Sequence, residues 1–436
     1  MKTLSKIIIS VAGAAAIFFF ISFSNHLSLS SPANIASNAI NGISQILKGQ
    51  GSVASSTDET GDIGNQQPLA DPPTVLKGVY STGWSAGSAR SINYLVNFIK
   101  QSGFNAIVID IKDYSGYLSY RINEPDFNAD GANNQIKIAQ INRLIKALHD
   151  QNIYVIGRIT VFQDPVLAKA HPEWALYNKT TGATWLDDNK LAWMDPASQE
   201  VWNYNVEIAK DALSRGFDEI NFDYVRFASD GDLNNISYPF WNGKTPKAEI
   251  IKDFFAYLRK ELPDARLSAD LFGLTTINHD DLGIGQIIEN AFPYFNYIDP
   301  MVYPSHYASG FLGYKNPALY PYEVIRYSLD HALARLKEYE IKEADSTSST
   351  STPSNNLPQE KIPQEYSTGS TPIRAKIRPW LQDFNLGATY DASMVSKEVN
   401  AVKDTFATSS DDFGGFLMWS PSNIYTQGVF NNSTSN

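Results

Sequence analysis

From about residue 75 onward, short apolar runs alternate with segments whose apolar residues recur at helical spacing. Such runs, rich in Val, Ile and aromatic residues, predict strands, and spacings of three and four predict helices. Strands are expected within residues 75–84, 105–113, 154–162, 218–227, 265–273, 297–307, 375–384 and 414–423. The clearest helical patterns span residues 88–103, 140–151, 198–216 and 246–262. For the third helix, Asp195 and Pro196 supply an expected N-cap and first helical position.

This alternation of strands and helices predicts an α/β protein, specifically a (β/α)8 TIM barrel formed by residues 75–430. An open, doubly wound sheet is the alternative, but no glycine-rich phosphate loop follows the first strand. Little helical pattern follows the eighth strand. We therefore expect the last helix to be missing or to be replaced by the N-terminal segment.

The ends of the chain and one internal segment differ from this pattern. Lys2 and Lys6 precede the uncharged, mostly apolar residues 7–23, which predicts either an N-terminal membrane anchor or a cleaved signal peptide at residues 1–23. Either would place the rest of the chain outside the cytoplasm. Small and polar residues predict a low-complexity tether at 24–74, with a short amphipathic helix around 35–47, a disordered insertion at 343–374 and a tail at 431–436.

Polar residues occur at regular positions near the ends of the expected strands. Because side chains alternate between the two faces of a strand, one face of each strand points into the barrel. This alternation assigns to the interior Asp110, Lys112, Asn221, Asp223, Ser268, Asp270, Met301 and Tyr303. Active sites of such barrels lie at the C-terminal ends of the strands. Grouped carboxylates near Lys112, Arg158 and Arg226 therefore indicate a site, and the alternative is a buried structural network of ion pairs.

The seventh strand gives a weaker assignment. Its alternation turns Gln382 inward and Asp383 outward, although a bulge would exchange them. Aromatic residues also gather near the strand ends, where rings suit the apolar faces of sugars, although core packing explains any single ring. These residues are Trp84, Tyr303, Tyr307, Trp380 and Trp419.

Composition excludes several kinds of chemistry. The 436-residue chain has a formal net charge of −11, so nucleic acid is a poor partner, because that binding needs Lys and Arg to neutralise phosphates. It contains no cysteine, which excludes disulfides, thiolate catalysis and cysteine-bound zinc. The six histidines are scattered, with no H-x-H or H-x-x-x-H pair. We therefore expect no cofactor and no histidine-bound metal, and a carboxylate-bound calcium ion stays an alternative.

Several segments resemble the bacterial putative glycosyl hydrolase domain family: "KGVYSTGW", "FNAIVIDIKDYSG", "GRITVFQDP", the run from "WMDPASQEV" to "NFDYVRFASDG", "MVYPSHY" and "GFLMWSPSN". The resemblance covers roughly residues 75–428. It implies a TIM barrel related to α-amylase-like hydrolases, and hydrolysis of glycosidic bonds.

Two wider resemblances suggest roles for individual residues. Asp218, Asn221, Asp223, Met301, Tyr303 and Trp419 match positions of the chitinase-like hydrolases, but Val225 stands where their catalytic Glu is expected. By likeness to the α-amylase family, Asp223 matches the nucleophile and Asp383 the assisting Asp, while Asp270 stands where a Glu acid is expected.

The leading hypothesis is a glycosidase that acts on an envelope or extracellular polysaccharide. Asp223 would act as nucleophile or base, kept ionised by Arg226 or Arg158, Asp270 would act as the acid and Asp383 would assist. Substrate contacts are expected from Asp110, Lys112, Arg158, Arg226, Tyr303, Gln382, Trp84 and Trp419.

Two other functions stay open. One is a catalytically inactive, membrane-anchored glycan-binding barrel, which Val225 and the missing fifth-strand Glu favour. The other is a metal-dependent hydrolase or deacetylase, which would need clustered histidine ligands. His306, in the segment "YPSHY", is the histidine best placed to line the site.

Overall fold

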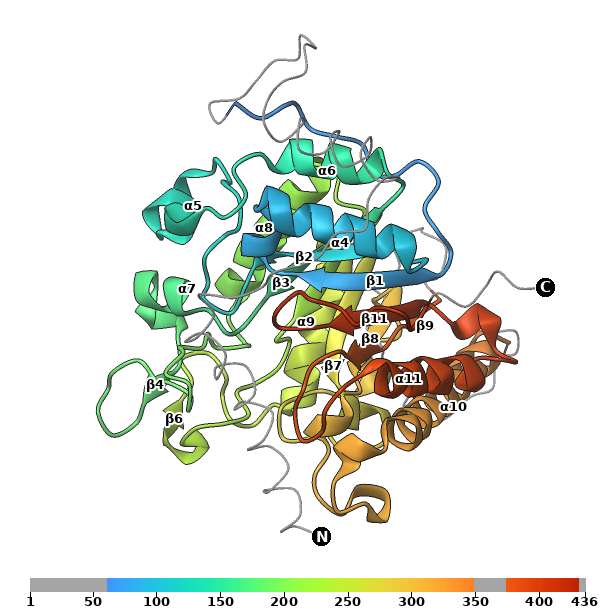
Figure 1. Ribbon diagram of the computed structural model, residues 1–436. Helices are drawn as coiled ribbons and strands as arrows, with labels where there is room; N and C mark the ends of the chain where they lie inside the picture. Colours follow the sequence, from blue (N-terminus) through green and yellow to red (C-terminus); the bar gives the residue numbers. More distant parts are fainter. Residues whose placement is uncertain (1–60, 349–373, 431–436) are drawn as a thin grey trace, which may run out of the picture.

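The computed structural model describes residues 61–348 and 374–430 (Figure 1). In these residues the main sheet is closed and entirely parallel. Its strands are β1 (Leu76–Ser81), β2 (Ala106–Lys112), β3 (Tyr154–Thr160), β5 (Glu219–Asp223), β7 (Leu267–Phe272), β8 (Tyr297–Met301), β9 (Lys376–Ile377), β10 (Trp380–Gln382) and β11 (Gly415–Trp419). β9 and β10 are two parts of the seventh strand, separated by Arg378 and Pro379. β11 pairs with β1 and β10 pairs with β8, which closes the barrel and excludes the open sheet.

Helices surround the barrel, with α4 and α6 on one side and α10 and α11 on another (Figure 1). The long helices are α4 (Ala89–Gln101), α6 (Ile141–His149), α8 (Gln199–Ser214), α9 (Lys247–Glu261), α10 (Pro321–Ser348) and α11 (Ala392–Thr405). Shorter elements in the loops are α3 (Gly83–Ala86), α5 (Pro125–Ala129), α7 (Pro165–Ala170), and the antiparallel pair β4 (Tyr177–Asn178) and β6 (Ile236–Ser237). The four predicted helices are confirmed, but 3-10 turns follow β7 in place of an α-helix.

The predicted N-cap of α8 is wrong. Ser198, not Asp195, caps this helix, and its hydroxyl accepts from the backbone N–H of Val201 at 3.4 Å. Asp195 instead accepts from the backbone N–H groups of Phe240 and Trp241, at 2.7 and 2.9 Å. The carboxylate therefore joins two loops that are distant in the sequence.

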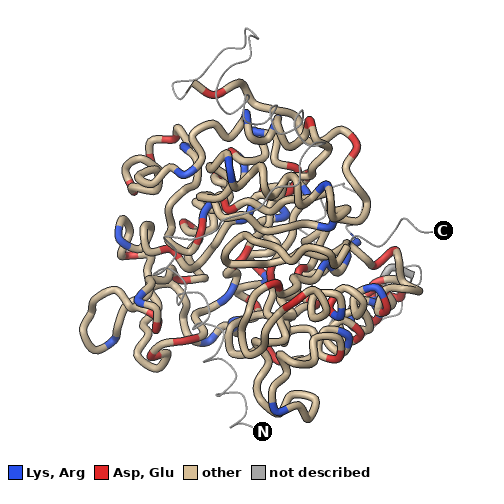
Figure 2. The backbone as a smooth tube through the Cα atoms, in the orientation of Figure 1, with Lys and Arg blue, Asp and Glu red and all other residues tan. Residues whose placement is uncertain are grey.

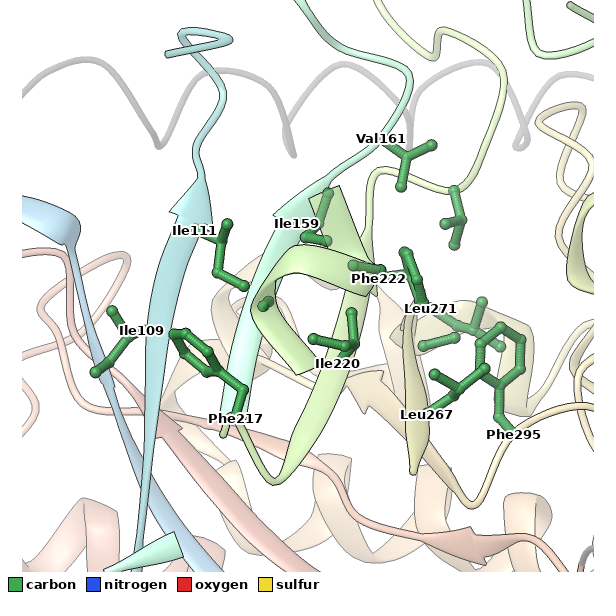
Figure 3. Close-up of a cluster of buried hydrophobic side chains, with 14 of the residues drawn as sticks. Ile109, Ile111, Ile159, Val161, Phe217, Ile220, Phe222, Leu267, Leu271 and Phe295 are labelled. Atoms are coloured by element: carbon green, nitrogen blue, oxygen red, sulfur yellow. The ribbon is translucent and has the colours of Figure 1, made fainter. Parts of the chain in front are cut away.

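Apolar side chains on the outer faces of the strands pack against the helices. Figure 3 shows Ile109, Ile159, Ile220 and Leu267 in this layer. The regular alternation is broken in β2, where a bulge at Ile111 brings Lys112 into register with Ile159 of β3. A Cβ atom on Gly157 would lie 2.3 Å from Ile111 Cδ1, so glycine makes room for the bulge.

The barrel interior has an apolar half and a polar half. Strands β11, β1, β2 and the first part of β3 contribute the apolar side chains Leu76, Ala106, Val108, Ile156 and Leu417. Strands β5, β7 and β8, and the residue that follows β9, contribute the buried polar side chains Glu219, Asn221, Ser268, Asp270, Asp299 and Arg378. Figure 2 shows acidic and basic positions within the strands as well as on the helices. A buried charged side chain is costly unless it is paired. The partners of these polar side chains therefore show what the polar half of the interior does.

The C-terminal segment packs at the place where the last helix of the barrel is missing. In the described residues no helix follows β11. The rings of Tyr425 and Phe430 pack on Phe98, Phe104 and Phe416 beside β1 and β11. The expectation that the last helix is missing is thus confirmed for the described residues.

Residues 61–74, which composition assigned to the tether, pack on the barrel. Asp62 accepts from the backbone N–H of Asn142 and Arg143 at the start of α6, at 2.8 and 3.1 Å. Leu69 donates its backbone N–H to Asp218 and packs against the apolar interior at the N-terminal end of the strands. This part of the segment thus belongs to the folded domain.

The predicted anchor or signal, the helix at 35–47 and the tail at 431–436 lie outside the described residues. The predicted insertion lies outside them from residue 349 to 373. Its start at residue 343 is wrong, because α10 continues to Ser348. None of the helices in the described ranges is long and apolar enough to cross a membrane.

Candidate active site

Arg158, on β3, joins three carboxylates near the C-terminal ends of neighbouring strands. Its Nη1 lies 2.6 Å from Asp110 Oδ1, and its Nη2 lies 2.5 Å from Asp223 Oδ2. Its Nε lies 3.8 Å from Asp270 Oδ2. We call these four residues the Arg158 cluster. The structure therefore brings together Asp110, Asp223 and Asp270, as the alternation predicted, and Arg158 rather than Arg226 is their cation.

Asp223 is the last residue of β5, and the residue after it has an unusual backbone conformation. Its Oδ1 accepts from the backbone N–H of Tyr224 at 2.6 Å, and its Oδ2 faces Arg158. Tyr224 has a φ of 55°, in the left-handed region that residues other than glycine rarely adopt. Such backbone strain is found most often at functional sites. The local conformation therefore holds the Asp223 carboxylate in a fixed direction.

Asp270 is buried more deeply than Asp223, with 2% of its surface exposed against 6%. Trp380 Nε1 donates to its Oδ1 at 2.7 Å, and Asn221 Nδ2 donates to the same oxygen at 2.9 Å. Burial raises the pKa of Asp270 well above the usual value, and the neighbouring Asp223 charge raises it further. Its surroundings therefore favour the protonated form of the group.

The two donors also decide which oxygen of Asp270 carries the proton. Both hydrogen bonds end on Oδ1, which must therefore act as the acceptor oxygen. The proton is left for Oδ2, the oxygen that faces Arg158. Arg158 also pairs with Asp223, so Oδ2 of Asp270 lies on the side of the cluster that includes Asp223.

Asp110 holds Arg158 in place. Its Oδ2 accepts from the hydroxyl of Tyr80 at 2.5 Å, while its Oδ1 accepts from Arg158. The guanidinium carbon of Arg158 lies 5.7 Å from the centre of the Tyr80 ring, close enough for a cation–π contact. These contacts give Asp110 a positioning role, and its expected contact with substrate stays a prediction.

An aromatic group borders the Arg158 cluster. The Trp419 ring lies 6.4 Å from Tyr80, 5.6 Å from Tyr303 and 4.9 Å from Phe384, measured between ring centres. The charges of Asp270 and Asp223 raise the pKa of Tyr303 further than burial alone, which places this ring beside the carboxylates. His306 packs edge-on against Tyr303, and burial lowers its pKa to about 4, so its ring is neutral. Aromatic faces of this kind suit the apolar side of a sugar ring.

Two predicted members of the site lie elsewhere. The bulge in β2 turns Lys112 to the outer face, where its ammonium pairs with the buried Asp164 at 2.6 Å. Arg226 lies against the rings of Trp193 and Phe272 and donates to Ser229 Oγ at 2.9 Å. The assignment of Lys112 to the barrel interior is therefore wrong, because one extra residue reverses the alternation.

The seventh strand follows its simple alternation. Gln382 points inward and accepts from the Ser305 hydroxyl at 2.8 Å. Asp383 uses both carboxylate oxygens for the backbone N–H and the hydroxyl of Thr426, at 2.7 and 2.6 Å. Asp383 thus anchors the C-terminal segment and is not joined to the Arg158 cluster. Trp84 lies in α3, after β1, and is 57% exposed.

A second group of charges lies deeper in the barrel and was not predicted. Arg378 binds Asp299 through Nε at 3.0 Å and through Nη2 at 2.7 Å, and its Nη2 also binds Glu219 at 2.5 Å. We call these three residues the Arg378 cluster; all are fully buried. The alternation would have found two of them, because Glu219 shares a face with Asp223, and Asp299 shares a face with Met301.

Residues 61–348 and 374–430 contain no group of three or more His, Asp and Glu side chains arranged to hold a metal ion. In the Arg158 cluster each carboxylate faces a guanidinium or neutral N–H and O–H donors. Carboxyl groups surrounded by hydrogen-bond donors are suited to the transfer of protons. The site is therefore built from neighbouring carboxyl groups and an arginine.

A closed (β/α)8 barrel with such carboxyl groups at the C-terminal ends of its strands places the protein among the glycoside hydrolase-like barrels. Residues 78–425 match the family described as a putative glycosyl hydrolase domain, and the chain belongs to that family. No functionally curated protein matches the sequence.

Solved structures are similar at two levels. A hypothetical protein from Ruminiclostridium thermocellum is 40% identical over 47% of this chain and 98% of its own, with a TM-score of 0.41. The glycoside hydrolase domain of PgaB (BpsB) from Bordetella bronchiseptica is 13% identical over 79% of this chain and 94% of its own, with a TM-score of 0.51. The second likeness supports the barrel fold.

Proposed function

We propose that the protein is a glycosidase in which Asp223 and Asp270 are the two catalytic carboxyl groups. One observation carries this proposal: Arg158 joins Asp223 to Asp270, a buried Asp whose pKa is raised, at the end of the barrel where such enzymes act. Glycoside hydrolysis needs this combination, since one carboxyl group must give a proton while the other is ionised. Membership of the family supports a carbohydrate substrate.

The chemistry follows from the directions of the two groups. Asp270 Oδ2–H gives its proton to the glycosidic oxygen as the bond to the anomeric carbon breaks. Asp223 stabilises the positive charge that develops there, and either attacks the anomeric carbon or takes a proton from an attacking water molecule. Arg158 holds Asp223 through Nη2 and Nε, at 2.5 and 3.2 Å, and orients its carboxylate. The anomer released first, read by NMR, distinguishes direct attack from attack by water.

The substrate class proposed is a polysaccharide of the cell envelope or the extracellular space. Its support is the sequence of residues 1–23, which is typical of an anchor or signal. Rings of Trp419 and Tyr303 beside the carboxylates would stack on the sugar. Fractionation of cells that express the full chain tests the location, and a purely cytoplasmic protein would contradict this part of the proposal.

The test is a reducing-sugar release screen with residues 61–436, because residues 61–74 belong to the fold. The Asp223→Asn variant is the matched change, and Glu219→Gln is the control. Both replace an inward carboxylate of β5 by its amide, but Glu219 lies in the Arg378 cluster. We expect release by the wild-type protein, its loss by about 10³-fold or more in Asp223→Asn, and its retention in folded Glu219→Gln.

Two results would overturn the proposal. Equal release by Asp223→Asn and the wild-type protein would remove Asp223 from the chemistry. Glycan binding without release in either protein would favour the non-catalytic glycan-binding barrel, in which the Arg158 cluster only holds the strands together.

A further inference from the structure

Asp270 and Asp299 are direct neighbours inside the barrel. They are register partners on β7 and β8, where adjacent parallel strands lie roughly 4.8 Å apart. One nitrogen, Asn221 Nδ2, donates to both carboxyl groups, at 2.9 Å to Asp270 Oδ1 and 3.2 Å to Asp299 Oδ2. All three side chains are buried. Asn221 therefore links the Arg158 cluster above it to the Arg378 cluster below it.

The hydrogens available to this link are limited. Asn221 Nδ2 carries two hydrogens and lies near a third acceptor, Ser268 Oγ, at 3.0 Å. Ser268 gives its own hydrogen to Glu219 at 2.6 Å, so it only accepts from Asn221. The amide thus has no hydrogen to spare for neutralising a second charge. Two ionised carboxylates side by side in a low-dielectric interior repel each other, and a proton on one of them removes that repulsion.

The arginines decide which of the two carboxyl groups keeps the proton. Arg378 donates to both oxygens of Asp299, at 3.0 and 2.7 Å. Asp270 has only Arg158 Nε, at 3.8 Å. The negative charge is therefore better stabilised on Asp299, and the proton remains with Asp270.

Other charged and titratable groups surround the pair from every adjoining strand. Those facing Asp270 and Asp299 are Arg158, Asp223, Glu219, Tyr297, Tyr303 and Arg378. Burial raises the pKa of Asp299 to about 7, whereas Asp270 is raised well above its usual range. The two hydrogen bonds from Arg378 favour ionisation of Asp299 over that of Asp270, and the charge on Asp299 then opposes the ionisation of Asp270.

We propose that Asp299 is a positioning residue for the reaction: its carboxylate, joined to Asp270 through the Asn221 amide, holds the transferable proton on Oδ2 of Asp270. This inference rests on the proposed role of Asp270 as the acid. Asp299 lies in the Arg378 cluster, deeper in the barrel than the site, and would affect the reaction without touching the substrate.

The test measures the proton on Asp270 directly. Difference infrared spectra over a pH series, with ¹³C-labelled aspartate, report the carbonyl band of the protonated carboxyl group, which is assigned by its absence in Asp270→Asn. In Asp299→Asn we expect the midpoint of this band to fall by about one pH unit or more, because a neighbouring negative charge has been removed. The alkaline limb of kcat/KM should move to lower pH by the same amount.

Glu219→Gln is the matched control for this experiment. It removes the same charge from the same arginine, but Glu219 is bonded to Ser268 and Tyr154 and not to Asn221. A purely structural role of the Arg378 cluster would affect both variants alike. We expect the midpoint in Glu219→Gln not to fall. An unchanged midpoint in Asp299→Asn, or an equal fall in both variants, would overturn the inference.

A measurement on the wild-type protein covers the case in which Asp299→Asn does not fold. The carbonyl band of Asp270 should shift in frequency as Asp299 ionises near pH 7, before Asp270 itself loses its proton. A single step without this earlier shift would contradict the coupling. If the midpoint falls in Asp299→Asn while the wild-type protein releases no sugar, the positioning role stands and the proposed glycosidase function fails.

Discussion

Two arginines lie inside this barrel, each between carboxylates, and they differ in access to solvent. Arg378 binds Glu219 and Asp299, and all three side chains are fully buried. Arg158 binds Asp110 and Asp223 with 15% of its side chain exposed. The first cluster is closed, whereas the second meets solvent at the end of the strands where ligands enter.

The difference shows how one kind of interaction serves two purposes. In the Arg378 cluster the cation is bonded through Nε, Nη1 and Nη2, so the charges satisfy one another. The Arg158 cluster has one cation for three carboxyl groups, against two in the Arg378 cluster, and the third, Asp270, stays at 3.8 Å with a raised pKa. A surplus of carboxyl groups over cations, next to solvent, leaves one proton available for transfer.

The largest expected effects, on stability and on turnover, come from replacing Arg378 or Arg158. Arg378→Met would leave Glu219 and Asp299 buried without a partner, which costs about 3–5 kcal/mol of unfolding free energy. Arg158→Met should cost less, because water reaches its site, while turnover is lost. Chemical denaturation of both variants checks this, and equal losses of stability would remove the distinction between the clusters.

The pH dependence of stability sharpens the comparison. Asp299 has a folded-state pKa of about 7, above the usual aspartate value of about 3.9, so the folded protein binds more protons than the unfolded chain between these values. Its contribution to stability is fully present below pH 4 and is lost as the pH rises toward 7, at up to about 1.4 kcal/mol per pH unit. In Asp299→Asn this part of the slope should disappear. Urea unfolding at pH 5, 6 and 7 measures it, and an unchanged slope would contradict the raised pKa.

Trp380→Phe tests the hydrogen bonds that direct the proton. The change keeps an aromatic ring but removes the Nε1 donor to Asp270 Oδ1. We expect kcat to fall by about tenfold, the equivalent of one hydrogen bond between neutral groups. The alkaline limb of the pH profile should not move to lower pH, in contrast to Asp299→Asn. A movement in the same direction would mean that both variants act by general disturbance of the site.

The smallest expected effect belongs to Asp383. Its carboxylate accepts twice from Thr426, so Asp383→Asn should cost about 1 kcal/mol of stability. Turnover of the folded variant should stay within about twofold of the wild type. Sugar-release rates together with thermal unfolding check this, and a large loss of turnover would return Asp383 to the site.

The alternation of side chains along single strands was enough to place Asp110, Asp223 and Asp270 on one inner surface. It failed at Lys112, where a bulge at Ile111 adds one residue and reverses the faces. A bulge depends on what the neighbouring strand can accommodate, here the missing side chain of Gly157, and no local pattern in β2 contains that information.

By itself, the sequence determined the barrel, the order of its strands and the identity of the three central carboxyl groups, because hydrophobic periodicity is a local property. The tertiary structure alone decided that Arg158 rather than Arg226 is their cation, that Asp383 anchors the C-terminal segment, and that Asn221 joins two clusters. These choices depend on which side chains meet across strands far apart in the sequence. The protonation of Asp270 is likewise a result of burial and neighbouring charges, which exist only in the folded protein.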